Sequence, residues 1–241
     1  MIKYITTILV LLHVLLFSCA NKESRHEDKR FVTYFVNPQE KNVKLYYKDE
    51  NGANFQSLGN LKFWLEDQKT PLIFAMNGGM YKKDGSPQGL YIENHKMLSP
   101  LDSGTGGGNF YLKPNGVFYI TSANIAGISP TDAIEIRPEI KFATQSGPML
   151  LVDGDIHPAF QKNSTNLNIR NGVGILPDNT IVFAMSKKEI NFYDFACYFK
   201  SLGCTNALYL DGLVSRTFLP SEGWKQLDGN FGVIIGITSF K

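Results

Sequence analysis

The sequence predicts one α+β domain, built on a largely antiparallel β-sheet with few helices packed on it. Short apolar runs recur along residues 31–241, and turn dipeptides such as Asn-Pro, Asn-Gly and Pro-Asp separate them. This spacing is typical of strands joined as hairpins. Only two segments carry apolar residues at helical spacing. Because no repeat or linker interrupts residues 31–241, we expect a single domain there.

Ahead of this domain, residues 1–18 have the features of a signal peptide. Lys3 precedes an apolar run, residues 8–17, that is too short to span a bilayer comfortably. The run ends in Leu16-Phe17-Ser18-Cys19, which resembles a bacterial lipobox with Cys19 as the lipidated residue; a plain secretory signal or an uncleaved anchor is the alternative. Residues 19–30 are polar and charged, which predicts a tether. We therefore expect a protein held by lipid at the bacterial cell envelope, either periplasmic or surface-exposed.

In the first part of the domain, apolar runs and turn residues predict three strands, a helix and a hairpin. The helix begins at the cap residue Asn60 and Pro71 follows its end. The predicted elements are strands 31–36, 43–47 and 72–76, helix 60–68, and a hairpin of 89–93 with 96–99 over Asn94-His95. Residues 101–109 form a glycine-rich loop without the spacing of a phosphate-binding P-loop, so we interpret it as a flexible lip beside a cleft.

The second part of the domain contains the clearest helix and further hairpins. The helix runs over residues 191–202, with Asn191 as its cap, Asp194 at the capping-box position and Gly203 at its end. The predicted strands are 110–113 and 117–121 around Pro114-Asn115-Gly116, 133–136, 149–152, 173–176 and 180–185 around Pro177-Asp178-Asn179, 207–210 and 231–238.

Polar residues stand beside glycine at four strand ends, namely Asn77, Ser146, Arg170 and Asp211. A single such end is a turn, whereas four of them indicate a shared pocket. Asp211 follows the apolar run 207–210 and precedes Gly212, which lets the backbone turn or a ligand approach closely. The alternative for Asp211-Gly212 is an Asx turn that closes a hairpin.

Composition and cysteine spacing limit the classes of partner. The net charge is +2 and no basic run is present, so we expect neither nucleic acid nor an anionic membrane surface as a partner. If Cys19 carries lipid, Cys197 and Cys204 remain; they lie about 10 Å apart along a helix, so we expect free thiols. His26, His95 and His157 are scattered and no CxxC occurs, so the sequence predicts no metal site and no cofactor.

The order of the motifs resembles the phosphodiester glycosidase family over roughly residues 70–240. The motifs are Asn77-Gly78-Gly79-Met80, Ser146-Gly147-Pro148 with Asp153-Gly154, Arg170-Asn171-Gly172-Val173-Gly174, and Leu210-Asp211-Gly212 with Ser215. Residues 89–93 and 108–116 resemble its bacterial branch, long labelled a domain of unknown function. The family includes the enzyme that uncovers mannose 6-phosphate by removing N-acetylglucosamine. This chain departs from many relatives at Leu213, where they carry a further glycine.

The resemblance implies cleavage of a sugar-1-phosphodiester at the anomeric carbon. That reaction needs a carboxylate near this carbon, a cation for the phosphate and polar groups for the sugar. Asp211 is the expected carboxylate and Arg170 the expected phosphate clamp, because a guanidinium binds phosphate in a bidentate fork. The other expected substrate-binding residues are Asn77, Gly78, Ser146, Gly147, Asn171, Gly212 and Ser215.

A general acid can be dispensable, because phosphate leaves with low proton affinity. If a second carboxylate acts, Glu93 is the first candidate and Asp84 the next. Structural alternatives remain: Arg170 could pair with Asp211, Glu93 could be a solvated charge at a strand end, and Ser215 could bond the turn after Asp211. Arg216 is expected to face solvent or to give a second phosphate contact.

The leading hypothesis is a lipid-anchored phosphodiester glycosidase that acts on a phosphate-linked saccharide. A second is a non-catalytic lipoprotein that binds glycans or phosphate, a reading that Leu213 favours because it would narrow or reshape the pocket. A third is a phosphodiesterase that cleaves the P–O bond. The sequence weighs against the third, because such enzymes usually recruit metal ions and it contains no cluster of metal ligands.

Overall fold

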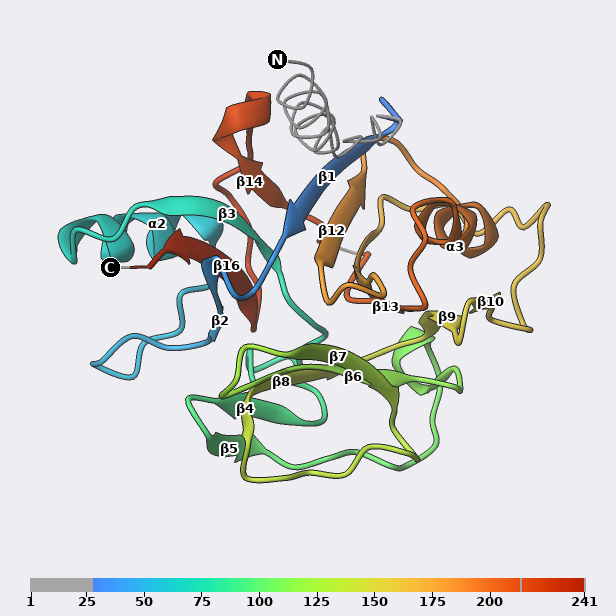
Figure 1. Cartoon of the computed structure of the whole chain (residues 1–241), viewed down its shortest axis with the longest axis horizontal. Coiled ribbons are helices and arrows are strands. Elements are labelled where there is room, and N and C mark those ends of the chain that lie inside the picture. Colours follow the sequence, from blue (N-terminus) through green and yellow to red (C-terminus); the bar gives the residue numbers. More distant parts are fainter. Residues whose placement is uncertain (1–27, 213, 241) are drawn as a thin grey trace, which may run out of the picture.

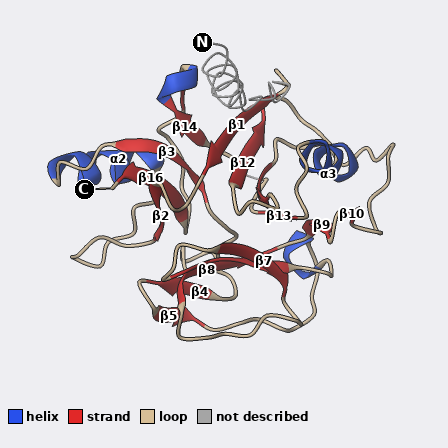
Figure 2. Ribbon diagram, in the orientation of Figure 1, coloured by secondary structure: helices blue, strands red, loops and turns tan. Residues whose placement is uncertain are grey.

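Three antiparallel sheets surround a common core in the computed structural model, which describes residues 28–212 and 214–240 (Figure 1). Figure 2 shows the strands forming the interior, with α2 and α3 at the periphery. The predicted signal peptide, Cys19, His26, most of the tether and Leu213 lie outside the described residues. In the described part of the chain, no helix combines the length and apolarity that a membrane crossing requires.

Sheet I has six strands in the order β1-β12-β11-β13-β9-β10, and helix α3 covers its outer face. Their bounds are Phe31–Val36 (β1), Ile181–Ser186 (β12), Asn171–Ile175 (β11), Asn206–Tyr209 (β13), Met149–Val152 (β9), Asp155–Ile156 (β10) and Phe192–Ser201 (α3). Gly174 lets α3 lie close to the sheet, because a Cβ there would be 2.7 Å from the Phe199 ring.

Sheet II has five strands in the order β15-β14-β3-β16-β2, and helix α2 packs on it through Leu58, Leu61 and Leu65. The bounds are Trp224–Lys225 (β15), Thr217–Leu219 (β14), Leu72–Asn77 (β3), Ile234–Ser239 (β16), Lys41–Tyr46 (β2) and Leu58–Asp67 (α2). The short 3₁₀ helix η2, Pro220–Glu222, joins β14 to β15.

Sheet III has five strands in the order β5-β4-β8-β6-β7, and loops rather than a helix cover its outer face. The bounds are Lys96–Ser99 (β5), Tyr91–Glu93 (β4), Ile140–Ser146 (β8), Gly116–Thr121 (β6), Ala126–Pro130 (β7) and Asn109–Tyr111 (the 3₁₀ helix η1). Leu101 and Ile134 pack on this face from the two covering loops.

The inner faces of all three sheets meet in one apolar core. Sheet I contributes Phe183 and Leu208, sheet II contributes Phe74 and Ile235, and sheet III contributes Phe118, all nearly or fully buried. Every sheet therefore buries one face in the shared core, and the α+β class with a largely antiparallel architecture is confirmed. One apolar core of this kind supports a single domain.

Most of the predicted elements are confirmed. Strands 31–36 and 149–152 match residue for residue, and α3 begins after Asn191, whose Oδ1 accepts from the Asp194 N–H at 2.8 Å. The predicted hairpin over Asn94-His95 has positive φ at both residues, as a type I′ turn requires. Helix α2 begins earlier than predicted, because the Oγ of Ser57, and not Asn60, caps it.

Two strand predictions are wrong. Residues 110–113 were expected to pair across Pro114-Asn115-Gly116, but β6 already has β7 and β8 on its two edges. The preceding segment instead forms η1, and the Asn115 Nδ2 donates to the Phe110 carbonyl at 2.9 Å. After β7, a strand that the sequence did not predict, the chain turns at residues 131–133, and residues 134–136 have no regular secondary structure. Strands β8, β10, β14 and β15 were missed as well.

Candidate active site

Four polar residues from all three sheets meet where strands end. Asn77 is the last residue of β3, Ser146 the last of β8 and Asn171 the first of β11, while Asp211 follows β13 by two residues. Hydrogen bonds connect Asn77, Asn171 and Asp211, and another attaches Ser146 to the residue before Asp211. The structure thus brings together four segments that the sequence predicted to share a pocket.

Asn171 is the link between β3 and the Asp211 turn. Its Nδ2 donates to both the carbonyl and the Oδ1 of Asn77, each at 2.9 Å, and its Oδ1 accepts from the Asp211 N–H at 2.9 Å. The Oδ1 of Asn77 also accepts from the Arg216 N–H at 2.9 Å. Two donors fix the orientation of the Asn77 amide, and its Nδ2 is buried without a hydrogen-bond partner among the described residues.

Two serines hold the backbone on either side of Asp211. The Ser146 Oγ donates to the Leu210 carbonyl at 2.7 Å, and the Ser215 Oγ lies 2.7 Å from the Asp211 carbonyl. Ser146 and Asn171 have no exposed surface, and Ser215 is 3% exposed. These side chains were expected to bind substrate; in the structure each is buried and bonds the backbone on either side of or at Asp211.

The glycines of the motifs are explained by close packing. A Cβ on Gly147 would lie 2.7 Å from the Phe110 carbonyl oxygen, and one on Gly212 would lie 1.9 Å from the Tyr209 hydroxyl. The Gly78 N–H, expected to face substrate, donates to the Val233 carbonyl at 2.8 Å. Substitution of these glycines would therefore displace the segments that meet at Asp211.

Two tyrosines near Asp211 were not singled out from the sequence. Burial raises the pKa of Tyr209, and the nearby Asp211 charge raises it further while Arg170 lowers it. Burial also raises the pKa of Tyr81, with a smaller contribution from Asp211. Both phenols therefore stay protonated at neutral pH and can donate hydrogen bonds. Their sequence signal is their position, directly after the Asn77–Met80 motif and two residues before Asp211.

Arg170 is fully buried beside this cluster, on the face of sheet I that α3 covers. Its Nε donates to the Ile190 carbonyl at 2.8 Å and its Nη2 to the Asn166 carbonyl at 2.9 Å, while its guanidinium lies 3.6 Å from the Phe192 ring centroid. Burial lowers its pKa. Two of the guanidinium nitrogens that were expected to bind phosphate, Nε and Nη2, thus donate to backbone carbonyls instead. The third, Nη1, is buried without a hydrogen-bond partner among the described residues.

The other expected charges do not join Asp211. Strand β4 pairs with β8 so that Ile92 lies opposite Ala143, which places Glu93 about 13 Å along the sheet from Ser146. The Glu93 carboxylate accepts from the Tyr91 hydroxyl at 2.6 Å, and burial raises its pKa. Two further charges lie on the surface: Asp84 bonds Ser86 in an exposed turn, and Arg216 forms a bidentate pair with Asp228 at 2.8 and 2.9 Å.

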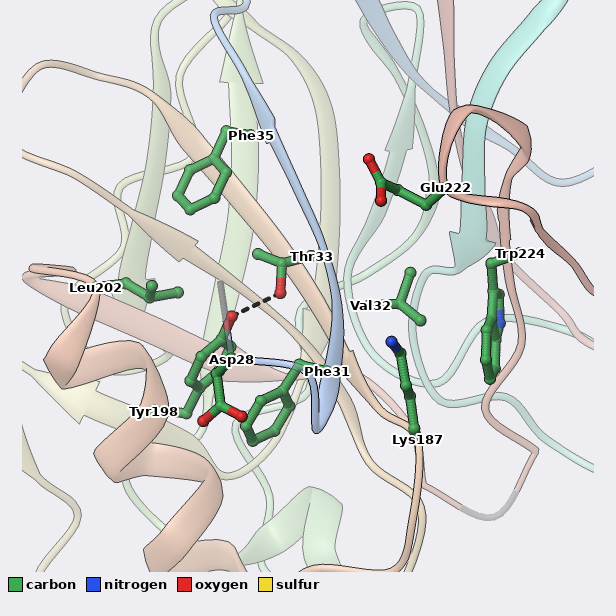
Figure 3. Close-up of a pocket in the computed structure, with 10 residues that line it drawn as sticks. All are labelled: Asp28, Phe31, Val32, Thr33, Phe35, Lys187, Tyr198, Leu202, Glu222 and Trp224. Carbon is green, nitrogen blue, oxygen red and sulfur yellow. Dashed lines mark hydrogen bonds between the residues drawn. The ribbon is translucent and has the colours of Figure 1, made fainter. Parts of the chain in front are cut away.

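A separate cavity of about 160 Å³ lies beside β1, away from these residues (Figure 3). Its lining includes Phe31, Lys187, Tyr198 and Trp224, and the Thr33 and Tyr198 hydroxyls are 2.6 Å apart. The lining contains none of the residues that the motifs predicted. Cys197 and Cys204 are not joined in a disulfide bond, and the described residues contain no group of three or more His, Cys, Asp or Glu side chains that could hold a metal ion.

A model of the phosphodiester glycosidase family matches residues 70–233. The chain belongs to this family. The matched range contains Asn77, Ser146, Asn171 and Asp211, the four residues that meet at the strand ends. The family resemblance drawn from the motifs is therefore confirmed.

A curated relative and solved structures are consistent with this assignment. The chain is 43% identical to the uncharacterized protein YigE of Escherichia coli K12 over 187 residues, covering 77% of this chain and 73% of the relative. The fold of this chain is similar to that of the catalytic domain of zebrafish N-acetylglucosamine-1-phosphodiester alpha-N-acetylglucosaminidase, which is auto-inhibited by its pro-peptide. The TM-score is 0.60 at 13% identity, and the match covers 89% of this chain and 85% of that structure. A putative exported protein of Burkholderia pseudomallei gives a TM-score of 0.57 at 10% identity, with coverage of 86% and 73%.

Proposed function

We propose that this phosphodiester glycosidase family member hydrolyses the glycosidic C–O bond of a sugar-1-phosphodiester, of the N-acetylhexosamine type, at the cell envelope. The observation that carries the proposal is the setting of Asp211. Its N–H, its carbonyl and the preceding carbonyl are each bonded to a buried side chain, while the residue keeps 8% of its surface exposed. These bonds fix the backbone from which the carboxylate projects before substrate arrives, and a preorganised negative charge stabilises developing positive charge.

The reaction needs few other groups. Water adds to the anomeric carbon, the C–O bond breaks, and the phosphate monoester leaves with the bonding electrons. In this proposal the Asp211 carboxylate stabilises the oxocarbenium-like transition state or takes the proton of the attacking water. The Tyr81 and Tyr209 hydroxyls are protonated donors for substrate oxygens. The Arg170 guanidinium lies 5.5 Å from the Tyr209 ring centroid and lowers the pKa of that hydroxyl, which makes it a stronger hydrogen-bond donor.

The envelope location and the lipid on Cys19 are part of the same proposal and are supported by the sequence of residues 1–30 alone. Metabolic labelling with palmitate tests them directly. We expect label on the full-length protein and its loss in Cys19→Ala. Equal labelling of both proteins would overturn the lipid assignment without affecting the proposed reaction.

The decisive test of the reaction is the bond that breaks. The purified full-length protein is incubated in oxygen-18 water with the methyl diester of N-acetylglucosamine 1-phosphate, with and without chelator. We expect the label in the free sugar, no effect of chelator, and a loss of rate of about 10²–10⁴-fold in Asp211→Asn. The exposed Asp67 at the end of α2 supplies the control Asp67→Asn, which should keep the wild-type rate.

Other outcomes identify other functions. Label in the phosphate product would indicate a phosphodiesterase. Saccharide binding without turnover, unaffected by Asp211→Asn, would indicate a binding lipoprotein. Either result would overturn the glycosidase proposal.

A further inference from the structure

A further cavity, of about 290 Å³, lies between the end of α2 and the edge of sheet II. Its lining comes from β2, from β16 and from the end of α2, which lie side by side at one end of the molecule (Figure 1). One lining residue, Thr238, pairs with Leu72 at the first residue of β3, whereas Asn77 is the last residue of that strand. The cavity therefore lies about 16 Å along β3 from Asn77, away from the Asp211 site.

Strand register brings two polar side chains to the floor of this cavity. Asn42 of β2 lies directly opposite Thr238 of β16, and directly paired residues share a face of a sheet. Side chains alternate along a strand, so Tyr46 lies on the same face of β2 as Asn42, and Tyr46 packs with the leucines of α2. The Asn42 and Thr238 side chains thus lie on the face that α2 covers, where the cavity is.

Three polar side chains of the lining have no partner in the part of the chain that the structure describes. The Thr238 Oγ1 is buried without a hydrogen bond, and Thr238 is 0% exposed. No hydrogen bond to a described residue involves the side-chain amides of Asn42 and Gln68 either. A buried hydroxyl without a partner is unfavourable, and it is explained where a bound molecule supplies the missing bond.

Trp64 supplies an aromatic wall beside these groups. Its Nε1 donates to the Glu50 carboxylate at 2.6 Å. Its ring makes edge contacts with the rings of Phe55 and Tyr46, at centroid distances of 5.1 and 6.3 Å. Trp64 is half-buried and lines the cavity. The indole is therefore held in place and presents an apolar surface next to side chains that donate and accept hydrogen bonds.

We propose that this cavity binds one unit of a neutral saccharide. A pyranose ring has apolar C–H faces that pack on an indole, and hydroxyls that both donate to and accept from amides and other hydroxyls. The described lining contains one charged residue, Lys44, and is otherwise neutral. The volume is close to the lower end of the range for ligand pockets, about 300–1,000 Å³, which suits a single ring. The inference does not depend on the proposed reaction, because it concerns binding at a separate surface.

The test uses Trp64 itself as the reporter. The chain has two tryptophans, Trp64 and Trp224, so in Trp224→Phe the indole emission comes from the cavity alone. This full-length protein is titrated with the trisaccharides of N-acetylglucosamine, glucose and mannose, and we expect a saturable change in emission with at least one of them. Adding Thr238→Val, which removes the hydroxyl and keeps the side-chain shape, should weaken binding about three- to tenfold, the loss of one hydrogen bond.

Two comparisons distinguish binding from a structural role. Thr238→Val should not lower Tm, because its hydroxyl has no partner among the described residues. Asn42→Ala/Gln68→Ala should weaken binding at least about tenfold, since two side chains lose their bonds to the sugar. The matched control Gln161→Ala/Asn163→Ala alters exposed amides in the loop after β10 and should leave binding unchanged.

The outcomes separate this inference from the proposed function. No saturable change with any of the three trisaccharides would overturn the inference. Binding that Thr238→Val and Asn42→Ala/Gln68→Ala both leave unchanged would also overturn it, because the sugar would then lie elsewhere. Hydrolysis of the methyl diester, measured on the same proteins, should not change, and its absence alongside intact saccharide binding at Trp64 would count against the Asp211 proposal alone.

Discussion

Replacement of Asn171 by alanine should destabilise the fold, because this one amide joins β3 to the Asp211 turn. The substitution removes three hydrogen bonds of 2.9 Å: two to Asn77 and one from the Asp211 N–H. All of them are buried, since Asn77 and Asn171 are 0% exposed and Asp211 is 8% exposed. Two lost bonds at about 0.5–1.5 kcal/mol each, and one stranded buried donor at about 1–3 kcal/mol, give a destabilisation of about 3 kcal/mol.

The assay is equilibrium urea unfolding, supported by thermal unfolding. For a chain of this size we expect Tm to fall by about 6–12 °C. Asn37→Ala is the control, because Asn37 is exposed and bonds only neighbours in its own turn, so its effect should stay within about 0.5 kcal/mol. A fall of less than about 1 kcal/mol in Asn171→Ala would refute the idea that this amide holds the site together.

Two further predictions concern buried charges. Burial raises the pKa of Glu93, so the folded protein binds more protons than the unfolded chain between the two pKa values, and the free energy of unfolding falls as pH rises through that window. In Glu93→Gln this fall should be absent, and parallel pH–stability curves for the two proteins would contradict the reasoning. Arg170→Ala removes the donors to Ile190 and Asn166, so trypsin should cleave the exposed Lys162 faster than in wild type. Arg137→Ala, at an exposed residue, is the control, and an unchanged cleavage rate in Arg170→Ala would show that Arg170 does not hold this loop.

The motif residues divide into those that sequence reasoning placed correctly and those that it could not place. Asn77, Ser146, Arg170 and Asp211 were expected to share a pocket because each stands near a strand end. Asn77, Ser146 and Asp211 do meet, and Asn171, the neighbour of Arg170, joins them in its place. Their catalytic and binding roles remain predictions. The sequence could not show that all four residues that meet are buried, with Asp211 keeping only 8% of its surface exposed, since burial depends on the neighbouring sheets.

Arg170 and Glu93 illustrate what the sequence could not settle. A guanidinium beside a motif suggests a phosphate-binding role. In the structure, however, Arg170 donates to the carbonyls of residues four and twenty positions away. The position of Glu93 depends on the register of β4 against β8, which turn chemistry near Glu93 does not specify. Tyr81 and Tyr209 were overlooked for the same reason: only the assembled sheets bring their hydroxyls near Asp211.

The sequence by itself determined the α+β class, the helix capped by Asn191, the hairpin over Asn94-His95 and the family, because caps, turns and motif order are local properties of the chain. Only the tertiary structure decided which buried side chains surround the Asp211 backbone, which carbonyls accept from Arg170, and why residues 110–113 form no strand. Each of these depends on partners distant in sequence, and a strand with both edges occupied, such as β6, accepts no further neighbour.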